Sequence, residues 1–428
     1  MTEEFIHYLW KFRLLFANLK LVSGEPITIL DPGIHNTDSG PDFFSARIRI
    51  GETTWAGNIE IHLKSSLWYE HKHHKDKAYE NVILHVVHVA DEVVRTQKNL
   101  PLPTLAVGNQ YNASIFECYK RFMTSRNWIA CENIINEAER FVVNSWLDRM
   151  LFERLETKAA GITAQLRFNK NDWERTFYEF LARNFGFKVN ALPFDLLAKS
   201  IPLKYLAKHH GNLMKTEAFF FGQAGLIPLK TREEYPANLL TEYRFLQSKY
   251  RLIPMDAHLW RFMRLRPSNF PTIRISQFAG LINRSSHLFS GVLEATTLRE
   301  LMALFEVTVS GYWTEHFRFG KKSAARNKSL GTESIRLIIV NTVIPFIFVY
   351  GQTRSDQRLI DRCLRFLEQI PGESNRITRK WETLGMSCRT SFNTQALLHL
   401  KSEYCSAKKC LSCSIGNELL KQSIVEVF

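Results

Sequence analysis

The apolar residues of this chain change their spacing once, and this change restricts the possible folds most strongly. Up to about residue 103 they alternate with polar residues in short runs, at 27–30, 44–50, 54–64 and 82–89. Alternation with a period of two is typical of strands that bury one face. From about residue 133 the spacing is helical almost throughout. The pattern predicts an α+β chain, with an opening helix over 2–19, a small N-terminal α/β domain and a large all-helical region.

The length of the chain sets the number of domains. A chain of 428 residues is too long for one typical domain of roughly 100–200 residues. The change in spacing and a C-terminal group of cysteines place the boundaries. We expect an α/β domain at 1–130, a helical domain at 131–385, and a cysteine-rich segment at 386–428 that packs on the helical domain.

The net charge favours a polyanionic partner. The chain has 56 Lys and Arg against 42 Asp and Glu, a formal charge of +14. Such an excess bears on partners and solubility rather than on the fold, and nucleic acid is the commonest polyanion. No signal peptide is evident, because the first residues are acidic. The most apolar run, 337–350, is shorter than the roughly 20 residues of a membrane span, so we expect a buried helix and a soluble, cytoplasmic protein.

A polar face on one strand is the first candidate site. In the run 57–64, Glu60, His62 and Lys64 share one face of the strand and isoleucines share the other. A two-residue turn at 51–52 would bring Asp42 level with Glu60, and a bulge at 41–42 would place both on one face. Two such carboxylates could hold Mg²⁺. The alternative is a solvated strand face with an ordinary Glu–Lys pair.

The first 95 residues resemble the PD-(D/E)xK nuclease superfamily. The resemblance lies in the opening helix, in Pro41-Asp42 at a strand start, and in an acidic and a basic residue on the next strand. It implies that Asp42 and Glu60 bind the metal and that a lysine positions the attacking water. The family lysine follows the acid by two residues, where this chain has His62. Either His62 replaces it, Lys64 moves in, or the site is inactive; Glu4 could add a carboxylate.

A group of histidines follows that strand directly. His71, His73, His74 and Asp76 could bind Zn²⁺, or they could form a solvated loop that suits a phosphate backbone. These residues come directly after the polar strand in the sequence. Of the functional interpretations, a role beside the active site is therefore favoured.

Four cysteines near the C-terminus suggest a second metal site. They are Cys388, Cys405, Cys410 and Cys413. Clustered cysteines in a cytosolic chain indicate metal more often than a disulfide. Either an iron–sulfur cluster or a closed zinc site would suit them, with Cys388 or His399 as the fourth ligand. Some nucleases of the superfamily named above carry such an iron–sulfur staple. The alternative is helix packing, as we expect for Cys118, Cys131 and Cys363.

Two basic stretches are candidate nucleic-acid contacts. Arginines alternate with aromatic residues in 260–275, and lysines gather in 317–328. Basic groups neutralise phosphates while rings stack on bases, although an amphipathic helix with a basic outer face would look the same. The candidate residues are Arg261, Arg264, Arg266, Arg274, Lys321 and Lys322.

Several stretches together resemble a bacterial family, domain of unknown function 2851. They are 57–68, 71–87, 269–274 and 408–416, and they span nearly the whole chain. The resemblance supports one chain-long unit but implies no reaction. The expected function is a metal-dependent nuclease, or a nuclease-derived protein, acting on nucleic acid, with DNA favoured. The alternative is a non-enzymatic nucleic-acid-binding or scaffold protein with a degenerate nuclease-like domain.

Overall fold

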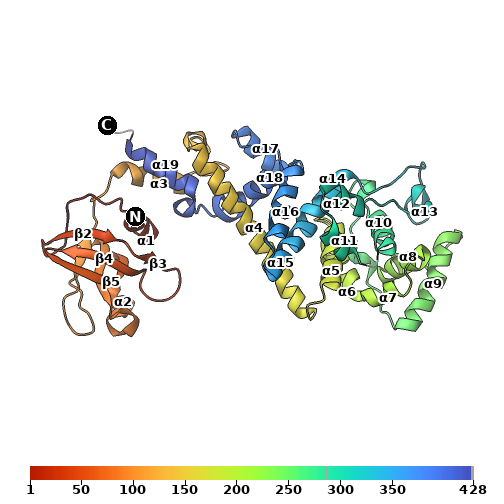
Figure 1. Cartoon of the computed structure of the whole chain (residues 1–428), viewed down its shortest axis with the longest axis horizontal. Helices are drawn as coiled ribbons and strands as arrows, with labels where there is room; N and C mark the ends of the chain where they lie inside the picture. Colours follow the sequence, from red (N-terminus) through yellow and green to blue (C-terminus); the bar gives the residue numbers. More distant parts are fainter. Residues whose placement is uncertain (286, 426–428) are drawn as a thin grey trace. The chain divides into compact units, whose positions relative to one another are not determined.

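The computed structural model describes residues 1–285 and 287–425 and divides the chain into two compact units. The first unit combines residues 1–147 with 400–428, and the second comprises 148–399. Figure 1 shows the sheet and its two flanking helices α1 and α2 in the N-terminal colours, and a succession of helices in the rest of the chain. The α+β class predicted from the spacing is confirmed.

The first unit contains a seven-stranded mixed sheet. Its strands are β1 (Leu19–Lys20), β2 (Pro26–Asp31), β3 (Ile34–His35), β4 (Phe43–Ile50), β5 (Thr53–Lys64), β6 (Val82–Val89) and β7 (Thr104–Ala106). The helical segments of this unit are α1 (Glu3–Lys11), α2 (Leu67–Glu70), η1 (His73–Lys75), η2 (Lys77–Tyr79), α3 (Ala113–Thr124), η3 (Ile135–Glu137), the start of α4 (Arg140–Phe168), the π-helix η7 (Leu400–Cys405), η8 (Cys410–Ser412) and α19 (Ser414–Val425).

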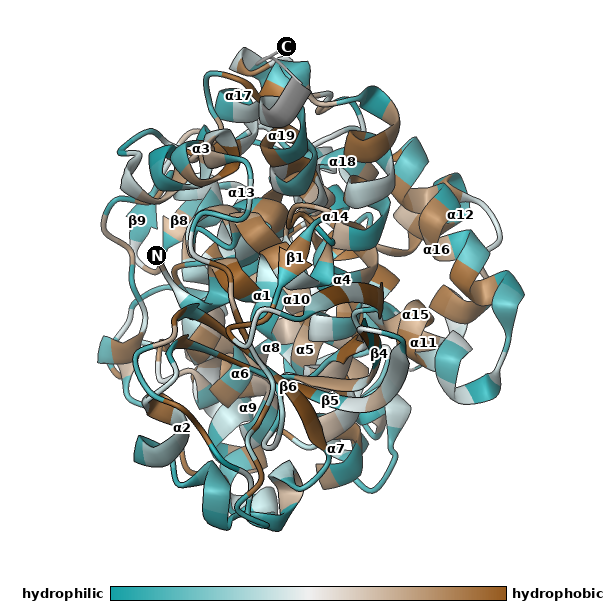
Figure 2. Cartoon of the chain, turned by 90° about the vertical axis from the view of Figure 1, so that its left-hand side faces the viewer, coloured by the Kyte–Doolittle hydropathy of each residue, from teal (hydrophilic) through white to brown (hydrophobic). Residues whose placement is uncertain are grey.

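The strand order is β1-β2-β4-β5-β6-β7, with β3 paired to β4. Neighbours from β1 to β5 are antiparallel, whereas β5, β6 and β7 run parallel. Parallel strands need a crossover, and the segment with α2, η1 and η2 provides it between β5 and β6. In Figure 2 apolar stretches follow the strands β4 and β6. β5 therefore lies in the interior of the sheet, between β4 and β6.

Helix α1 covers this sheet and is shorter than predicted. Thr2 caps its N-terminus by accepting a hydrogen bond from the backbone N–H of Phe5. The helix ends at Lys11, because Arg13 adopts a φ of 53° that a right-handed helix cannot contain. Its apolar residues Ile6 and Trp10 belong to the core that includes Ile59 and Ile61 of β5. Burial of this shared core fixes α1 against the strand that carries Glu60.

The second unit is largely helical, and the hairpin of β8 and β9 is the exception among the residues described. Its elements are the remainder of α4, α5 (Trp173–Phe185), α6 (Ala191–Ser200), α7 (Leu203–Ala207), α8 (Leu213–Gln223), α9 (Glu234–Tyr250), η4 (Ala257–Leu259), η5 (Pro267–Asn269), α10 (Pro271–Arg284), α11 (Leu288–Glu294), α12 (Leu298–Leu304), α13 (Gly311–Thr314), β8 (His316–Arg318), β9 (Lys321–Lys322), α14 (Thr332–Ile338), the π-helix η6 (Ile339–Val343), α15 (Ile344–Arg354), α16 (Gln357–Gln369), α17 (Arg376–Thr383) and α18 (Ser391–His399).

The most apolar segment is a buried helix, as predicted. Residues Thr332–Arg354 form one helix that is long and apolar enough to cross a membrane, but 72% of its most apolar window is buried in the structure. It widens into η6 just before Pro345, a residue without a backbone N–H for the helical ladder. Its burial is that of a core helix.

The domain boundaries differ from the prediction at the C-terminus. Residues 400–428 belong to the N-terminal unit, not to the helical one. Helix α19 packs against α3, and η8 packs against α1. The first boundary also lies later than predicted, inside α4. A helix that continues through a boundary leaves no break in the apolar spacing for a sequence to reveal.

Candidate metal centre on the N-terminal sheet

The structure brings Asp42 and Glu60 together across the pair β4–β5. Phe43 pairs with Ile59 but Ala46 pairs with Gly57, so one extra residue of β4 bulges out between them. Ser45 takes a φ of 57° in this bulge. The bulge lies two to three residues later than the predicted position at 41–42. Its consequence is the one expected, because the extra residue places Asp42 beside Glu60.

Asp42 lies just before β4 and Glu60 lies on β5, and each carboxylate accepts a hydrogen bond from the backbone next to the other one. The N–H of Asp42 donates to Glu60 Oε2 at 3.3 Å. The N–H of Ile61 donates to Asp42 Oδ2 at 2.8 Å. These two bonds fix both acidic groups to rigid strands and keep them side by side.

This pair places two acidic groups side by side in a nearly dry place. The Glu60 side chain is 6% exposed and that of Asp42 is 23% exposed. Burial, and then the neighbouring Asp42 charge, raise the pKa of Glu60 to about 9. Two buried carboxylates repel each other unless a proton or a cation lies near them. The arrangement therefore favours a cation at this point.

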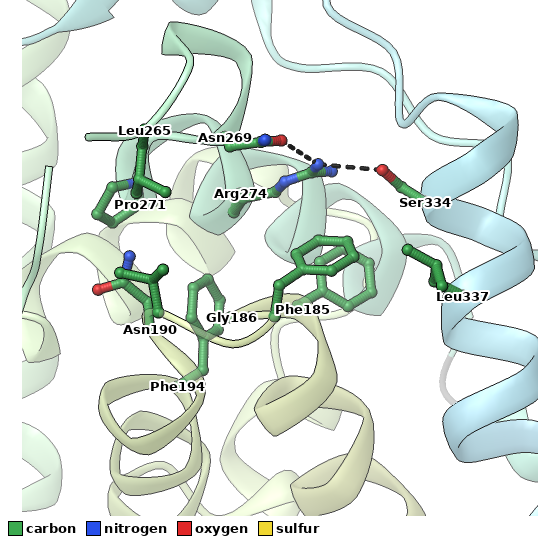
Figure 3. A pocket seen from close by; sticks show the side chains of 12 residues that line it. Phe185, Gly186, Asn190, Phe194, Leu265, Asn269, Pro271, Arg274, Ser334 and Leu337 are labelled. Carbon is green, nitrogen blue, oxygen red and sulfur yellow. Dashed lines mark hydrogen bonds between the residues drawn. The ribbon is translucent and has the colours of Figure 1, made fainter. Parts of the chain in front are cut away.

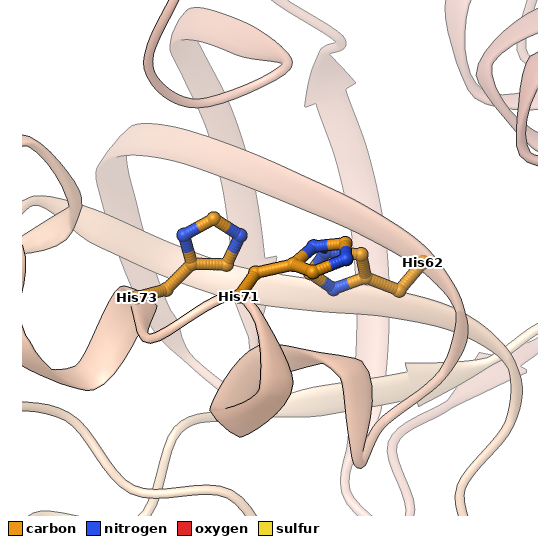
Figure 4. Close-up of side chains that lie close together, drawn as sticks. All are labelled: His62, His71 and His73. Carbon is orange, nitrogen blue, oxygen red and sulfur yellow. Dashed lines mark hydrogen bonds between the residues drawn. The ribbon is translucent and has the colours of Figure 1, made fainter.

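Three imidazoles approach Glu60 from the other side. His62 Nε2 lies 3.5 Å and His73 Nε2 lies 3.3 Å from Glu60 Oε1, and His71 Nδ1 lies 3.1 Å from His62 Nε2. The ligand atoms of His62, His71 and His73 all lie within 4.8 Å of one another. Figure 4 shows His62 on strand β5 and the other two on the segment that follows α2. This His trio and Glu60 form a four-residue donor set.

Burial keeps the inner imidazoles neutral. Burial first, and then the neighbouring histidines, lower the pKa of His62 to about 2 and that of His85 to about 3. His62 Nδ1 and His85 Nε2 lie 2.8 Å apart, so one proton lies between them. His85 reaches His62 because β5 and β6 pair Glu60 with His85 in parallel register. A neutral imidazole keeps a lone pair, which is what a metal ligand needs.

Helix α1 adds two further polar groups to this region. Glu3 Oε1 accepts the backbone N–H of Leu63 at 3.2 Å, and His7 Nε2 lies 3.4 Å from Asp42 Oδ2. Glu3 and His7 are four residues apart and share one face of the helix. Glu4, which the sequence suggested, is exposed and points elsewhere, because its charge acts on Tyr119 and Cys410. The helix carboxylate beside β5 is Glu3.

Three imidazole nitrogens in this cluster lack hydrogen bonds, and one of them is Nδ1 of His85. The Nε2 atoms of His7 and His73 are buried and have no hydrogen-bond partner, although each lies 3.3–3.4 Å from a carboxylate oxygen. Buried polar atoms are normally satisfied. Nitrogen and oxygen atoms this close, without hydrogen-bond geometry, are what two ligands of one ion would show. The donor set therefore fits a divalent metal.

The other residues named from the sequence lie outside this cluster. Lys64 is exposed at the end of β5. Asp76 caps η2 by accepting the N–H of Ala78. His74 packs its ring on Tyr69. Of the three histidines after the strand, His71 and His73 thus join the cluster and His74 does not.

The C-terminal cysteines gather without the predicted fourth ligand. Cys405, Cys410 and Cys413 line one cavity together with Cys131. Cys388 instead donates a hydrogen bond to the carbonyl of Thr378 at 3.5 Å, and His399 lies 3.6 Å from Glu153. Both residues belong to the second unit. The fourth cysteine of the cluster is one that the spacing had suggested to be an isolated core residue.

Five of the six basic candidates are exposed, and the sixth is not. Arg261, Arg264, Arg266, Lys321 and Lys322 are exposed in the second unit. Arg274 is buried, and its guanidinium donates to Gln277 at 3.0 Å, Asn269 at 2.6 Å and Ser334 at 3.1 Å. Figure 3 shows it on the wall of a pocket of about 230 Å³. Arg274 is therefore not the surface phosphate contact expected from the sequence, because it is buried and both terminal nitrogens of its guanidinium donate hydrogen bonds inside the fold.

Arg274 should matter for stability instead. Replacing it with Met removes three hydrogen bonds and leaves buried polar partners unpaired, so we expect the free energy of unfolding to fall by about 3 kcal/mol. Urea denaturation followed by circular dichroism measures this. The matched control is Arg266→Met, an exposed arginine, expected to change stability by at most about 0.5 kcal/mol. Equal stability of the two variants would contradict the structural role.

Fold and site together define an α+β protein whose N-terminal sheet holds a buried cluster of two carboxylates and several imidazoles. The chain belongs to the family described as "Protein of unknown function (DUF2851)", whose model matches residues 3–376. The resemblance noted from the sequence is thus confirmed over nearly the whole chain. No curated protein and no solved structure matches this chain.

Four residues of the two clusters were missed in the sequence. Glu3 and His7 had a usable signal, since their spacing places them on one helix face. His85 lies in an apolar strand run, and only the register of β5 against β6 brings it to His62. Cys131 lies more than 270 residues before Cys405 in the chain, so no spacing rule could group it with the C-terminal cysteines.

Proposed function

We propose that the N-terminal unit is a divalent-metal-dependent nuclease. The observation that supports this most is the pair Asp42–Glu60, held on adjacent strands with imidazoles against Glu60 Oε1. Carboxylate pairs on rigid strands suit metal-assisted phosphodiester hydrolysis, because the metal and the ligands stay fixed while charge develops on the phosphate. The resemblance of residues 1–95 to the PD-(D/E)xK superfamily leads to the same reaction class.

The donor set suggests which metals the site would accept. The central donor set offers one carboxylate oxygen, from Glu60, and three imidazole nitrogens, from His62, His71 and His73. A further carboxylate oxygen comes from Asp42 and a further imidazole nitrogen from His7. Oxygen ligands suit Mg²⁺ and Mn²⁺, while imidazole suits Zn²⁺ and other transition metals. We therefore extend the expected Mg²⁺ to Mn²⁺ and Zn²⁺, with Mn²⁺ best matched to a mixed set.

The chain's own residues would divide the work. A bound divalent ion lowers the pKa of water and stabilises the charge of the phosphate. His85 orients His62 through the 2.8 Å contact at Nδ1, which leaves Nε2 of His62 to face Glu60. His71 is exposed, so its imidazole can exchange protons with solvent. Lys64 is not needed in this scheme, since His62 occupies the position of the family lysine.

The substrate class follows from charge. The formal charge of +14 and the exposed bases Arg261, Arg264, Arg266, Lys321 and Lys322 suit a phosphate backbone. DNA is the substrate that we would test first, with RNA beside it. The alternative function, a nucleic-acid-binding or scaffold protein, uses the same basic residues without the reaction.

The direct test is a cleavage assay with the purified full-length chain. Plasmid, linear DNA, single-stranded DNA and RNA are incubated with Mn²⁺, Mg²⁺ or Zn²⁺, and with EDTA as control. We expect cleavage of at least one substrate that depends on metal and stops with EDTA. Salt-dependent binding without cleavage under all three metals would favour the scaffold function. Absence of salt-dependent binding would contradict both.

The salt dependence of binding gives a separate prediction. Each phosphate contact contributes about 0.9 to the slope of log K against log salt. Replacing both Lys321 and Lys322 with Gln should lower the magnitude of that slope by about 1–2 and weaken binding equally for different sequences. Fluorescence anisotropy across a salt series measures it. An unchanged slope in the double variant would show that the β8–β9 hairpin does not contact the nucleic acid.

A further inference from the structure

Four cysteines from two distant parts of the chain meet inside the first unit. Cys131 follows α3, whereas Cys405 ends η7 and Cys410 and Cys413 flank η8. All four line the same cavity, together with Phe122, Tyr404 and Gly416 among others. In the chain, the entire second unit lies between Cys131 and Cys405. The convergence is therefore a result of folding, not of local sequence.

The local backbone holds the three C-terminal thiols in place. The N–H of Cys413 donates to the carbonyl of Cys410 at 3.3 Å, in the tight turn that a Cys-x₂-Cys pair needs for chelation. Gly416 lies so close that a Cβ there would approach the Cys410 carbonyl oxygen to 2.3 Å. Lys408 takes a φ of 52°, and its ammonium donates to the carbonyls of Met123 and Ser125. This lysine links the cysteine turn to the chain just before Cys131.

The thiols that line this cavity disfavour one another's ionisation. Burial raises the pKa of Cys405 well above its usual range, and Cys413, Cys131 and Cys410 raise it further. Burial raises the pKa of Cys131 to about 12, with Cys413 and Cys410 as the next causes.

Positive and hydrogen-bonding groups surround the same sulfurs. Burial raises the pKa values of Cys405 and Cys410, and the charges of Lys401 and Lys408 partly offset this rise; Lys409 lines the cavity. Backbone hydrogen bonds from Gly416 and Ile415 act on Cys413 in the same sense. Such hydrogen bonds to thiolate sulfur are a regular feature of iron–sulfur sites.

The separation of the sulfurs distinguishes a cluster from a single ion. Zinc bound by four thiolates at about 2.3 Å would hold the sulfurs about 3.8 Å apart. Among the residues described, the one group of three or more donors within 4.8 Å is His62, His71 and His73, so no three of these sulfurs are that close. Thiolates bound to different irons of one cluster stand farther apart than ligands of one ion.

We propose that Cys131, Cys405, Cys410 and Cys413 ligate one iron–sulfur cluster that fastens the C-terminal segment to the N-terminal unit. Cys131 takes the place that we expected for Cys388 or His399. The cluster would stabilise the region next to the candidate nuclease site, because η8 packs against α1, the helix that carries Glu3 and His7. The proposal does not depend on nuclease activity.

The test is anaerobic purification of the full-length chain, with iron, acid-labile sulfide and zinc measured per chain. We expect iron and sulfide in equal amounts, with the visible absorption of thiolate-to-iron charge transfer. Cys131→Ser and Cys410→Ser should each lose most of both. The matched controls are Cys118→Ala, a buried cysteine in α3 outside the cavity lining, and Cys388→Ala; both should keep the cluster.

The same samples give outcomes that would overturn the proposal. Stoichiometric zinc without sulfide would contradict the cluster. Loss of iron in Cys388→Ala with retention in Cys131→Ser would contradict the ligand set. If the serine variants do not fold, limited proteolysis of the wild type answers instead: removal of iron by a chelator should expose the segment after residue 400 to cleavage, and unchanged protection would count against the proposal.

Discussion

Replacing Glu60 with Gln is expected to lower metal-dependent cleavage about a thousandfold, since loss of a metal ligand removes roughly 4 kcal/mol of transition-state stabilisation. Binding of nucleic acid should stay within about twofold, because the basic residues are untouched. The folded state should not suffer, because an amide in place of the buried carboxylate ends its repulsion with Asp42. Steady-state cleavage, anisotropy and urea denaturation separate these three effects.

The matched control for this substitution is Glu52→Gln, at the exposed turn that joins β4 to β5 on the same hairpin. It should leave cleavage unchanged. Metal binding offers a second measurement, since saturation at about 100 times Kd raises the stability of the folded state by about 2.7 kcal/mol. We expect Mn²⁺ to raise the Tm of the wild type and not that of Glu60→Gln. Equal cleavage by the two glutamine variants would exclude Glu60 from the reaction.

Replacing Gly222 with Ala is expected to destabilise the protein by about 3 kcal/mol, the upper end of the usual cost of overpacking. Alanine normally stabilises a helix relative to glycine by about 1 kcal/mol. Here α8 packs on α9, and a Cβ at Gly222 would approach the ring of Tyr243 to 2.0 Å. That ring has little room to move, because its hydroxyl donates to Gln223 at 3.0 Å.

The control for Gly222 is a helical glycine with free space. Gly161 in α4 has no atom within 4 Å of its virtual Cβ, so Gly161→Ala should stabilise the protein by up to about 1 kcal/mol. The two alanine variants should therefore change the free energy of unfolding in opposite directions. Chemical denaturation of both measures this, and stabilisation by Gly222→Ala would show that α8 and α9 are not packed this closely.

Local sequence patterns were sufficient to predict which parts of the chain form strands or helices, and to predict the polar face of β5. The change of apolar period separated the sheet from the helices, because period and burial are tied directly to backbone geometry. The alternation from Gly57 to Lys64 placed Glu60 and His62 on one face, and both are buried on β5. The turn at 51–52 brought Asp42 level with Glu60, although the bulge that sets the register lies at Ser45.

Charge was a weaker guide than periodicity. Arginine alternating with aromatic residues suggested a phosphate surface, and Arg261, Arg264 and Arg266 are indeed exposed. Arg274 belongs to the same stretch but lies on the buried side of α10, stacked 4.6 Å over the ring of Phe187. A list of charged residues does not say which side of a helix faces the core, and burial reverses the role of a guanidinium.

The sequence by itself determined the α+β class and the buried apolar helix, since each depends on an apolar period over neighbouring residues, and the two-residue turn at 51–52 was enough to predict that Asp42 lies level with Glu60. Only the tertiary structure decided which distant residues join them. His85 reaches His62 through the parallel register of β5 and β6, and Cys131 reaches Cys405, Cys410 and Cys413 because the chain returns to its first unit at residue 400. Such contacts form when the packing of the whole unit offsets the entropy of closing a long loop, and no local pattern records that balance.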